Sequence, residues 1–352
     1  MRADNLNRRV IRLLFWESTV RCNLSCAHCR RIEVDEKAAP DLSTKRAKEM
    51  IDQLADLGRM QNYMPILVFS GGEPLCRKDI FELIEYAGQK DLPAALATNG
   101  TLLDMPIAKK LKDAGVQRVS VSLDGATAKV HNKLRRQDGS FEAAIAGVKC
   151  LREAGVEFQI NVTMTKHNAD QLDEIFELSK KTGAVAVHLF MLVPVGCGEE
   201  FAPEDMLDSN EYERMLTKVA EKEKNAQIEI KVTCAPHYQR VKRQQGAKIE
   251  RMTKGCLAGL GVMFVSHCGD VFPCGYLPVN CGNILDADLK SIWQSSEELA
   301  KMRDTGQLKG KCSMCGYKEV CGGCRARAFA ATGDYMDQEP FCNYQPTTEE
   351  KT

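Results

Sequence analysis

The sequence CNLSCAHC, residues 22–29, is the segment around which the rest of this chain is organised. It follows a short apolar run, Ile11 to Trp16, that is typical of a β-strand. The spacing of Cys22, Cys26 and Cys29 lets one tight loop place three thiolates on three corners of a 4Fe–4S cube. One iron then has no protein ligand and is free to bind a small chelating molecule.

The composition excludes several classes of protein. The chain has 352 residues with 48 basic and 48 acidic side chains, so its formal net charge is zero. It has no block of basic residues, which argues against a nucleic-acid partner. We find neither a signal peptide nor an apolar run close to the roughly twenty residues of a membrane helix. A cytoplasmic protein without a membrane partner is therefore expected.

Sixteen cysteines are a large excess for a chain of this length. In a reducing cytoplasm they indicate metal or cluster ligands rather than disulfides. One group lies at residues 22–29 and another at 256–342, with few between, so two cluster-bearing regions are expected. A zinc knuckle is the alternative at the first group. It needs a fourth ligand, and His28 lies inside the triplet, where its reach is poor.

Strand-like and helical patterns alternate through the first half of the chain. Apolar runs typical of strands cover residues 11–16, 65–69, 94–98, 116–123, 156–164 and 185–192. Helical periodicity lies between them, at residues 42–57, 79–87, 107–114, 141–154 and 169–181. This alternation predicts an α/β fold in which a parallel sheet with right-handed crossovers curls as a partial (β/α)6 TIM-like barrel.

Polar and glycine-rich residues fall where these strands end. The first strand leads to the cysteine triplet and the second to the sequence SGGEP at residues 70–74. The third leads to Asn99, and the fourth to Ser122 and Asp124. Because ligands of such sheets bind beyond the carboxyl ends of the strands, these loops are expected to surround one site.

The sequence divides into a barrel, a bridging segment and a small cysteine-rich α+β domain, at residues 1–195, 196–250 and 251–352. A polar helix (210–224) and a short strand (228–232) are expected in the bridging segment. The last part begins with a hairpin (262–272) and an amphipathic helix (289–302), followed by a cysteine-dense coil. So small a segment has little apolar core, and we expect metal clusters to stabilise it.

The cysteine triplet followed by Gly-Gly-Glu-Pro resembles the radical S-adenosylmethionine (SAM) superfamily, over about the first two hundred residues. The resemblance implies that the open iron chelates the amino and carboxylate groups of SAM. The sulfonium is then split to methionine and a 5′-deoxyadenosyl radical, so the cofactor rather than a side chain supplies the chemistry. The implied SAM-binding residues are Gly71, Gly72, Glu73, Pro74, Asn99, Ser122 and Asp124.

The glycines and Glu73 have a physical reason to bind SAM, whereas the polar residues also have an alternative structural role. Gly71 and Gly72 lack Cβ atoms, so backbone groups can approach the methionine ammonium closely, and Glu73 offers negative charge nearby. Asn99 and the polar residues after the fourth strand are candidate partners of the ribose or the methionine carboxylate. Their alternative role is turn formation and helix capping.

The C-terminal cysteines resemble the SPASM extension of peptide- and cofactor-modifying radical enzymes, which holds auxiliary 4Fe–4S clusters. By that resemblance the distal cluster binds Cys312, Cys315, Cys321 and Cys342, and the proximal cluster binds Cys256, Cys274 and Cys324. The fourth ligand of the proximal cluster is either Cys281 or Cys268, or the fourth iron has no protein ligand and is open to substrate. The last Cys pair has two intervening residues where the usual pattern has three, so one or two auxiliary clusters are expected. The alternative is a structural zinc site in the two Cys-x-x-Cys pairs.

Segments around these motifs narrow the family. They are WEST (16–19), HCR (28–30), CAPHY (234–238), CGYL (274–277), CGN (281–283) and CGGCRARA (321–328). Together they resemble the heme b synthases of the siroheme-dependent heme pathway, which oxidatively decarboxylate two propionates of iron-coproporphyrin III to vinyl groups. The resemblance implies a tetrapyrrole substrate, an auxiliary cluster that accepts one electron, and an external flavodoxin- or ferredoxin-like electron donor.

A substrate with four carboxylates needs cations, and guanidinium groups pair bidentately with carboxylates. The candidates are Arg30, Arg31, Arg135, Arg136, Arg240, Arg325 and Arg327. His28, His237 and Tyr238 are candidate contacts of the porphyrin or its iron. The alternative for the arginines is a solvated surface position, and for the other three ordinary packing.

Three other functions stay open. A related enzyme acts on didecarboxysiroheme, but its cysteine loop usually ends Cys-Tyr, whereas Arg30 follows the triplet here. The second alternative is a peptide-modifying SPASM enzyme. About ten residues precede the first strand, which argues against the peptide-modifying enzymes that need an N-terminal leader-binding domain. It does not argue against sulfatase maturases. A non-catalytic iron–sulfur electron carrier is the third, and it would have no use for the Gly-Gly-Glu-Pro loop.

Overall fold

The computed structural model describes residues 10–31, 39–248 and 254–346. Its strands form one sheet in the order β10-β9-β8-β1-β2-β3-β4-β5-β6-β7. They are β1 (Leu13–Glu17), β2 (Ile66–Ser70), β3 (Ala94–Thr98), β4 (Arg118–Ser122), β5 (Phe158–Met164), β6 (Ala186–Met191), β7 (Glu229–Thr233), β8 (Val262–Val265), β9 (Asp270–Phe272) and β10 (Gly282–Asn283).

The α-helices are α2 (Thr44–Met60), α3 (Ile80–Gln89), α4 (Met105–Asp113), α5 (Ala128–Arg135), α6 (Ser140–Ala154), α7 (Leu172–Thr182), α8 (Gly198–Asp205), α9 (Ser209–Glu223), α10 (Tyr238–Gln244), α11 (Leu289–Ser295), α12 (Glu297–Met302), α13 (Gly310–Met314) and α14 (Arg325–Thr332). Short 3₁₀ turns are η1 (Pro74–Cys76), η2 (Ala169–Gln171) and η3 (Thr305–Gln307). Side-chain caps begin several helices, as where Ser43 accepts from the Arg46 N–H and Asp104 from the Ile107 N–H.

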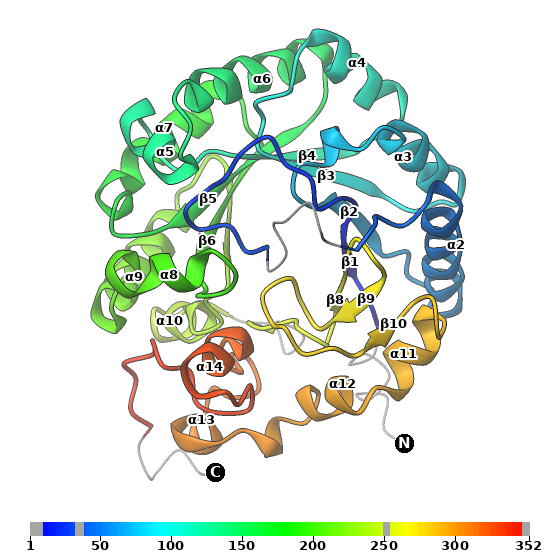
Figure 1. Cartoon of the computed structure of the whole chain (residues 1–352). Coiled ribbons are helices and arrows are strands. Elements are labelled where there is room, and N and C mark those ends of the chain that lie inside the picture. Colours follow the sequence, from blue (N-terminus) through cyan, green and yellow to red (C-terminus); the bar gives the residue numbers. More distant parts are fainter. Residues whose placement is uncertain (1–9, 32–38, 249–253, 347–352) are drawn as a thin grey trace.

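Strands β1 to β7 are parallel neighbours, and the sheet curls into an arc with α2, α3, α4, α6 and α7 on its outer side (Figure 1). The expected α/β fold, a partial TIM-like barrel, is confirmed. Helices α12 to α14 lie along the side that the arc leaves open (Figure 1). The carboxyl ends of the parallel strands meet at one edge, which brings the loops after β1 to β4 together.

The sheet continues beyond the six predicted barrel strands. β7, expected in the bridging segment, pairs with β6, and the hairpin strand β8 pairs in parallel with β1 (Leu13 opposite Val262). One sheet therefore crosses residues 195 and 250, the predicted domain boundaries, and the division into three parts stays a prediction. Residues 251–253 and 347–352 of the last predicted domain lie outside the described residues.

Two local expectations were wrong. The amphipathic helix expected at 289–302 is two helices, α11 and α12, because Ser296 is extended (ψ 123°) and starts the second one. The cysteine-dense coil contains α14, an alanine-rich helix whose first four residues are buried. That burial removes two predicted substrate cations, Arg325 and Arg327, from the surface.

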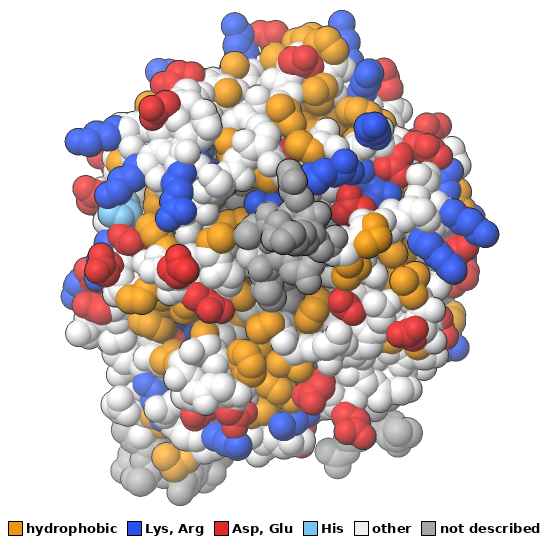
Figure 2. All heavy atoms as spheres, in the orientation of Figure 1, with side chains coloured by type: hydrophobic (Ala, Val, Ile, Leu, Met, Phe, Trp, Pro, Cys, Tyr) orange, Lys and Arg blue, Asp and Glu red, His pale blue; other side chains and the backbone are white. Residues whose placement is uncertain are grey.

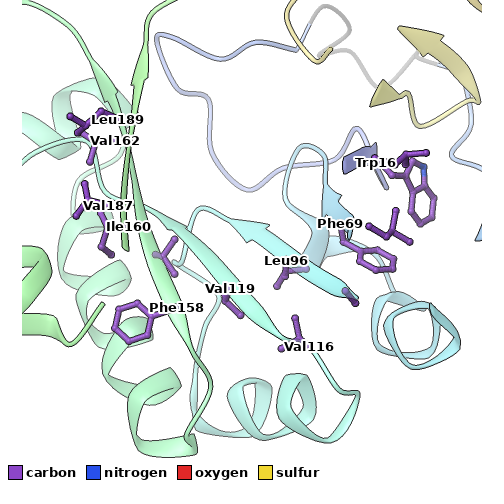
Figure 3. Packing of buried hydrophobic residues seen from close by; sticks show 14 of the residues in the cluster. Trp16, Phe69, Leu96, Val116, Val119, Phe158, Ile160, Val162, Val187 and Leu189 are labelled. Atoms are coloured by element: carbon purple, nitrogen blue, oxygen red, sulfur yellow. The ribbon is translucent and has the colours of Figure 1, made fainter. Parts of the chain in front are cut away.

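The apolar core fills the space between the strands and the surrounding helices. Trp16 of β1 and Phe69 of β2 pack with their ring centroids 5.8 Å apart, and side chains such as Leu96 and Val119 continue the layer along the sheet (Figure 3). Across the described ranges, every helix is too short or too polar to cross a membrane.

Candidate active site

Two loops of the candidate site are joined through their backbones. The Gly72 N–H donates to the Thr19 carbonyl (2.7 Å) and the Glu73 N–H to the Arg21 carbonyl (2.8 Å). A Cβ on Gly72 would lie 2.2 Å from the Arg21 oxygen, and one on Gly71 (φ +149°) would lie 2.5 Å from the Thr19 oxygen. The glycines are therefore required because the loop after β2 lies against the chain that enters the cysteine triplet.

We expect Gly72→Ala to destabilise the protein by about 1–3 kcal/mol, because the methyl group would overlap backbone atoms that cannot rotate away. Anaerobic unfolding in urea measures the change. Gly88→Ala is the matched control, since Gly88 lies in α3 with open space around its Cβ position and alanine favours a helix. Equal stability of the two variants would contradict this expectation.

Each thiol of the cysteine triplet has a nitrogen donor beside it. A backbone N–H lies 3.4 Å from Cys22 Sγ, Arg135 Nη1 lies 3.7 Å from Cys26 Sγ, and Arg31 Nε lies 3.3 Å from Cys29 Sγ. Burial raises the pKa of Cys22 and of Cys26, and a neighbouring thiol raises each further. Three adjacent thiols with two guanidinium groups suit a cluster whose thiolates carry negative charge.

Asp124 is fully buried and connects the loop after β4 to the triplet. Its Oδ2 faces His28 Nε2 (3.0 Å) and Arg135 Nη2 (2.6 Å), and its Oδ1 accepts the Thr163 N–H (2.8 Å). Burial alone would raise the pKa of Asp124, but Arg135 and His28 hold it well below its usual range. Both carboxylate oxygens are engaged, so Asp124 holds Arg135 beside Cys26. Its role in binding SAM stays a prediction.

Glu73 is also fully buried and joins the ends of β2 and β3. Its carboxylate accepts hydrogen bonds from the Thr98 hydroxyl and the Asn99 N–H (both 2.8 Å). Burial raises the pKa of Glu73 to about 7 despite these donors. The Asn99 amide in turn donates to Asn23 in the triplet loop (2.8 Å), and Ser122 is half-buried at the end of β4. Of the predicted SAM-binding residues, Glu73 and Asn99 are thus hydrogen-bonded to each other, and Asn99 connects them to the triplet loop.

Four thiols from distant parts of the chain meet in a second group. Cys234 and Cys324 share a hydrogen bond, which raises the pKa of Cys234. Cys274 lies beside Cys256 and Cys324, and burial raises its pKa to about 12. This proximal group contains the three predicted proximal ligands and one further thiol, that of Cys234.

Cys234 lies in the CAPHY segment quoted above, but it was not among the predicted cluster ligands. It follows β7 directly, in a left-handed conformation (φ +59°). The signal that points to it is its place at a strand end, which the other site loops share. Cys281 lies apart, with its Sγ 3.6 Å from the Val279 carbonyl, and Cys268 contacts Asp270. The structure therefore brings neither Cys281 nor Cys268 to the proximal group.

Cys312, Cys321 and Cys342 form a third, distal group. Burial raises the pKa of Cys321 strongly, and the thiols of Cys342 and Cys312 raise it further. The Gly323 N–H lies 3.4 Å from Cys321 Sγ. The Glu339 N–H lies 3.4 Å from Cys312 Sγ. Cys315 caps the carboxyl end of α13, in the turn that follows Cys312.

A buried ion pair connects the proximal and distal groups. Arg327 donates to Glu339 through Nε and Nη2 (3.0 Å each), and the two side chains are 0% and 1% exposed. The Glu339 carboxylate also accepts the Cys324 N–H (2.7 Å), while its own N–H points to Cys312. Burial would raise the pKa of Glu339, but the charge of Arg327 lowers it to about 2.

Other predicted substrate contacts already have protein partners. Arg240 pairs with Glu213 (2.5 Å), Arg325 donates to two backbone carbonyls (2.7 Å each), and the Tyr238 hydroxyl donates to a glutamate (2.7 Å). His237 is fully buried, and neither ring nitrogen has a partner among the described residues; burial lowers its pKa to about 4. These donors of the two arginines and the tyrosine are thus already engaged within the protein.

Arg30 lies between the barrel and the C-terminal hairpin. Its guanidinium lies 4.6 Å from the ring centroid of Phe264, donates to the Ser70 hydroxyl (3.2 Å) and approaches Glu17 (3.9 Å). A Cβ on Gly275, the residue after the proximal thiol Cys274, would lie 3.5 Å from it. Arg30 is therefore a half-buried cation between the triplet and the proximal group.

Comparison with known proteins supplies the family. A model of the radical SAM superfamily matches residues 16–179, and a model of the iron–sulfur cluster-binding domain SPASM matches residues 256–325. The chain is 49% identical to an AdoMet-dependent heme synthase of Methanosarcina barkeri, over 95% of this chain and 97% of that relative. The chain belongs to the radical SAM family.

Further comparisons agree. This radical SAM enzyme is 42% identical to an AdoMet-dependent heme synthase of Oleidesulfovibrio alaskensis, over 95% of this chain and 88% of the relative. It also resembles the solved structure of Streptococcus suis SuiB bound to S-adenosylmethionine, with a TM-score of 0.77 and 18% identity over 96% of this chain and 78% of that one. The latter similarity shows a shared fold.

The cofactors of this radical SAM enzyme are 4Fe–4S clusters and SAM. Its thiols fit that requirement, since they gather in three groups with backbone or guanidinium donors pointing to several sulfurs. Within the ranges given above, no three His, Cys, Asp or Glu side chains converge as they would around a single metal ion.

Proposed function

We propose that this enzyme makes heme b by oxidative decarboxylation of two propionate side chains of iron-coproporphyrin III to vinyl groups. The observation that carries the proposal is the 49% identity to an AdoMet-dependent heme synthase over nearly the whole of both chains. The identity also supports a tetrapyrrole substrate. We further propose an external one-electron donor, and the cytoplasm as the location.

The reaction determines what the site must accommodate. Each propionate loses a hydrogen atom from its β-carbon, carbon dioxide and one electron, which leaves a vinyl group. SAM and the cluster that Cys22, Cys26 and Cys29 would hold supply the 5′-deoxyadenosyl radical that takes the hydrogen. Cys234, Cys256, Cys274 and Cys324 would hold the auxiliary cluster beside the substrate.

Arg30 is the residue that we assign to a substrate carboxylate. It lies on the side of the triplet that faces the proximal group. Its guanidinium lies over the ring of Phe264. A half-buried guanidinium binds a carboxylate more strongly than a solvated one, because less water competes for its donors. Arg30 contacts Ser70 and Glu17 at 3.2 and 3.9 Å, whereas Arg240, Arg325 and Arg327 have partners at 2.5 to 3.0 Å and are therefore weaker candidates.

We expect Cys234→Ala to lower the iron content from about twelve to about eight per chain, since the proximal cluster would lose a ligand. Iron and sulfide analysis of anaerobically purified protein measures this. Cys281→Ala is the matched control and should retain all its iron, because Cys281 lies outside the thiol groups. An unchanged iron content in the Cys234 variant, or four irons with stoichiometric zinc in the wild type, would contradict the assignment.

Anaerobic incubation with SAM, a reductant and iron-coproporphyrin III, followed by mass spectrometry, tests the function. The proposal expects two successive losses, each of one carboxyl group and one hydrogen. Didecarboxysiroheme is the control substrate and should remain unchanged. Release of 5′-deoxyadenosine with unaltered porphyrin would retain the family and reject this substrate.

A further inference from the structure

Helix α5 (Ala128–Arg135) covers Cys26, the buried thiol of the cysteine triplet. On its inner side Arg135 Nη1 lies 3.7 Å from Cys26 Sγ, and the Leu134 carbonyl accepts the Ala27 N–H (2.9 Å). His131, Leu134 and Arg135 are buried. Cys26 therefore lies directly against the inner side of α5.

The outer side of α5 carries a positively charged hollow of about 380 Å³. Its lining residues are Lys129, Asn132, Lys133, Arg136, Gln137 and Asp138. Three cations thus face one carboxylate, in a chain whose formal net charge is zero. In Figure 2, several Lys and Arg side chains lie at the left of this face, over the position of α5 in Figure 1, with Asp and Glu side chains around them.

Among the residues that the structure describes, the cations of the hollow have few partners. Within the described residues Lys129 and Arg136 form no ion pair, and Lys133 contacts only His167 (3.4 Å). An uncompensated basic concavity attracts acidic partners over several ångströms and raises their association rate. It is therefore suited to a negatively charged protein surface.

We propose that this hollow is the docking surface for an acidic one-electron carrier protein that reduces the cluster of the triplet. Reductive cleavage of a sulfonium consumes one electron, which the carrier supplies while it is itself oxidised by one electron; no atom is transferred. The route is short: Lys133 in the hollow is bonded to Leu134, whose carbonyl accepts the N–H of Ala27, the neighbour of Cys26. The proposal depends only on the reduction of the cluster that all radical SAM enzymes need. It does not depend on the identity of the porphyrin substrate.

The test uses the holoenzyme and a purified acidic flavodoxin as the carrier. Lys129→Glu/Lys133→Glu should weaken flavodoxin binding, measured by calorimetric titration, at least about fivefold at low ionic strength, and added salt should shrink the difference. The rate of 5′-deoxyadenosine formation from SAM with reduced flavodoxin should fall in parallel. The rate with dithionite, which needs no docking surface, should stay within about twofold of the wild type.

Lys45→Glu/Lys109→Glu is the matched control. It changes the net charge equally at two exposed lysines of α2 and α4, which do not line the hollow, and should alter flavodoxin binding less than about twofold. Equal effects of the two double variants, or flavodoxin binding unaffected by reversal at α5, would overturn the proposal. Neither readout involves porphyrin, so the proposed function can fail while this inference stands.

Discussion

Cys26→Ala is expected to abolish SAM cleavage, with 5′-deoxyadenosine formation falling by about three orders of magnitude or more. Cys26 is the most buried thiol of the triplet and the one beside Arg135. Two remaining thiolates do not hold a 4Fe–4S cube, so the iron content should fall by about four per chain. Anaerobic iron analysis and chromatographic assay of 5′-deoxyadenosine measure both effects.

Cys150→Ala is the control for Cys26→Ala. Cys150 is half-buried in α6 and packs against the apolar core, far along the chain from the three thiol groups. Its removal should leave both iron and SAM cleavage unchanged. Full iron content and normal cleavage in the Cys26 variant would show that the triplet does not hold the radical cluster.

Glu339→Ala is expected to destabilise the protein by about 3–5 kcal/mol, because it leaves the Arg327 charge buried without a partner. It also removes the acceptor of the Cys324 N–H, so the proximal cluster should be lost more readily. The folded-state pKa of about 2 lies below the ordinary value of 4.5. The contribution of this carboxylate is therefore present above about pH 4.5 and is lost as the pH falls toward 2.

Two further variants test whether the unpaired charge of Arg327 causes this loss of stability. Arg327→Met/Glu339→Leu removes both charges and should recover much of the stability, because apolar side chains of similar volume suit a buried position. Glu49→Ala removes an exposed ion pair with Arg46 (2.7 Å) and should cost at most about 1 kcal/mol. Urea unfolding of anaerobically purified protein compares the three. A Glu339→Ala variant as stable as Glu49→Ala would mean that the buried pair contributes little.

The sequence was sufficient for features that depend on neighbouring residues. The spacing of Cys22, Cys26 and Cys29 predicts a loop with three adjacent thiols, and the alternation of apolar runs predicts the parallel sheet. Strand ends also predicted which loops would meet, since the carboxyl ends of parallel strands share one edge. The sequence also predicted that Gly72 is needed for close approach of the backbone, and the structure adds that its Cβ position lies against the Arg21 carbonyl.

The sequence itself determined the triplet loop, because chain connectivity limits how far Cys22, Cys26 and Cys29 can separate. It also determined the parallel sheet, because apolar strands that alternate with helices can bury both faces only in that arrangement. Tertiary structure decided what lies around them. Cys234 joins the proximal group and Cys281 does not, because β7 and the hairpin extend the same sheet and place the residues that follow them. Arg327 is an internal partner of Glu339 rather than a surface cation, because the whole first turn of α14 is buried. Such burial depends on contacts between distant segments, which spacing along the chain does not reveal.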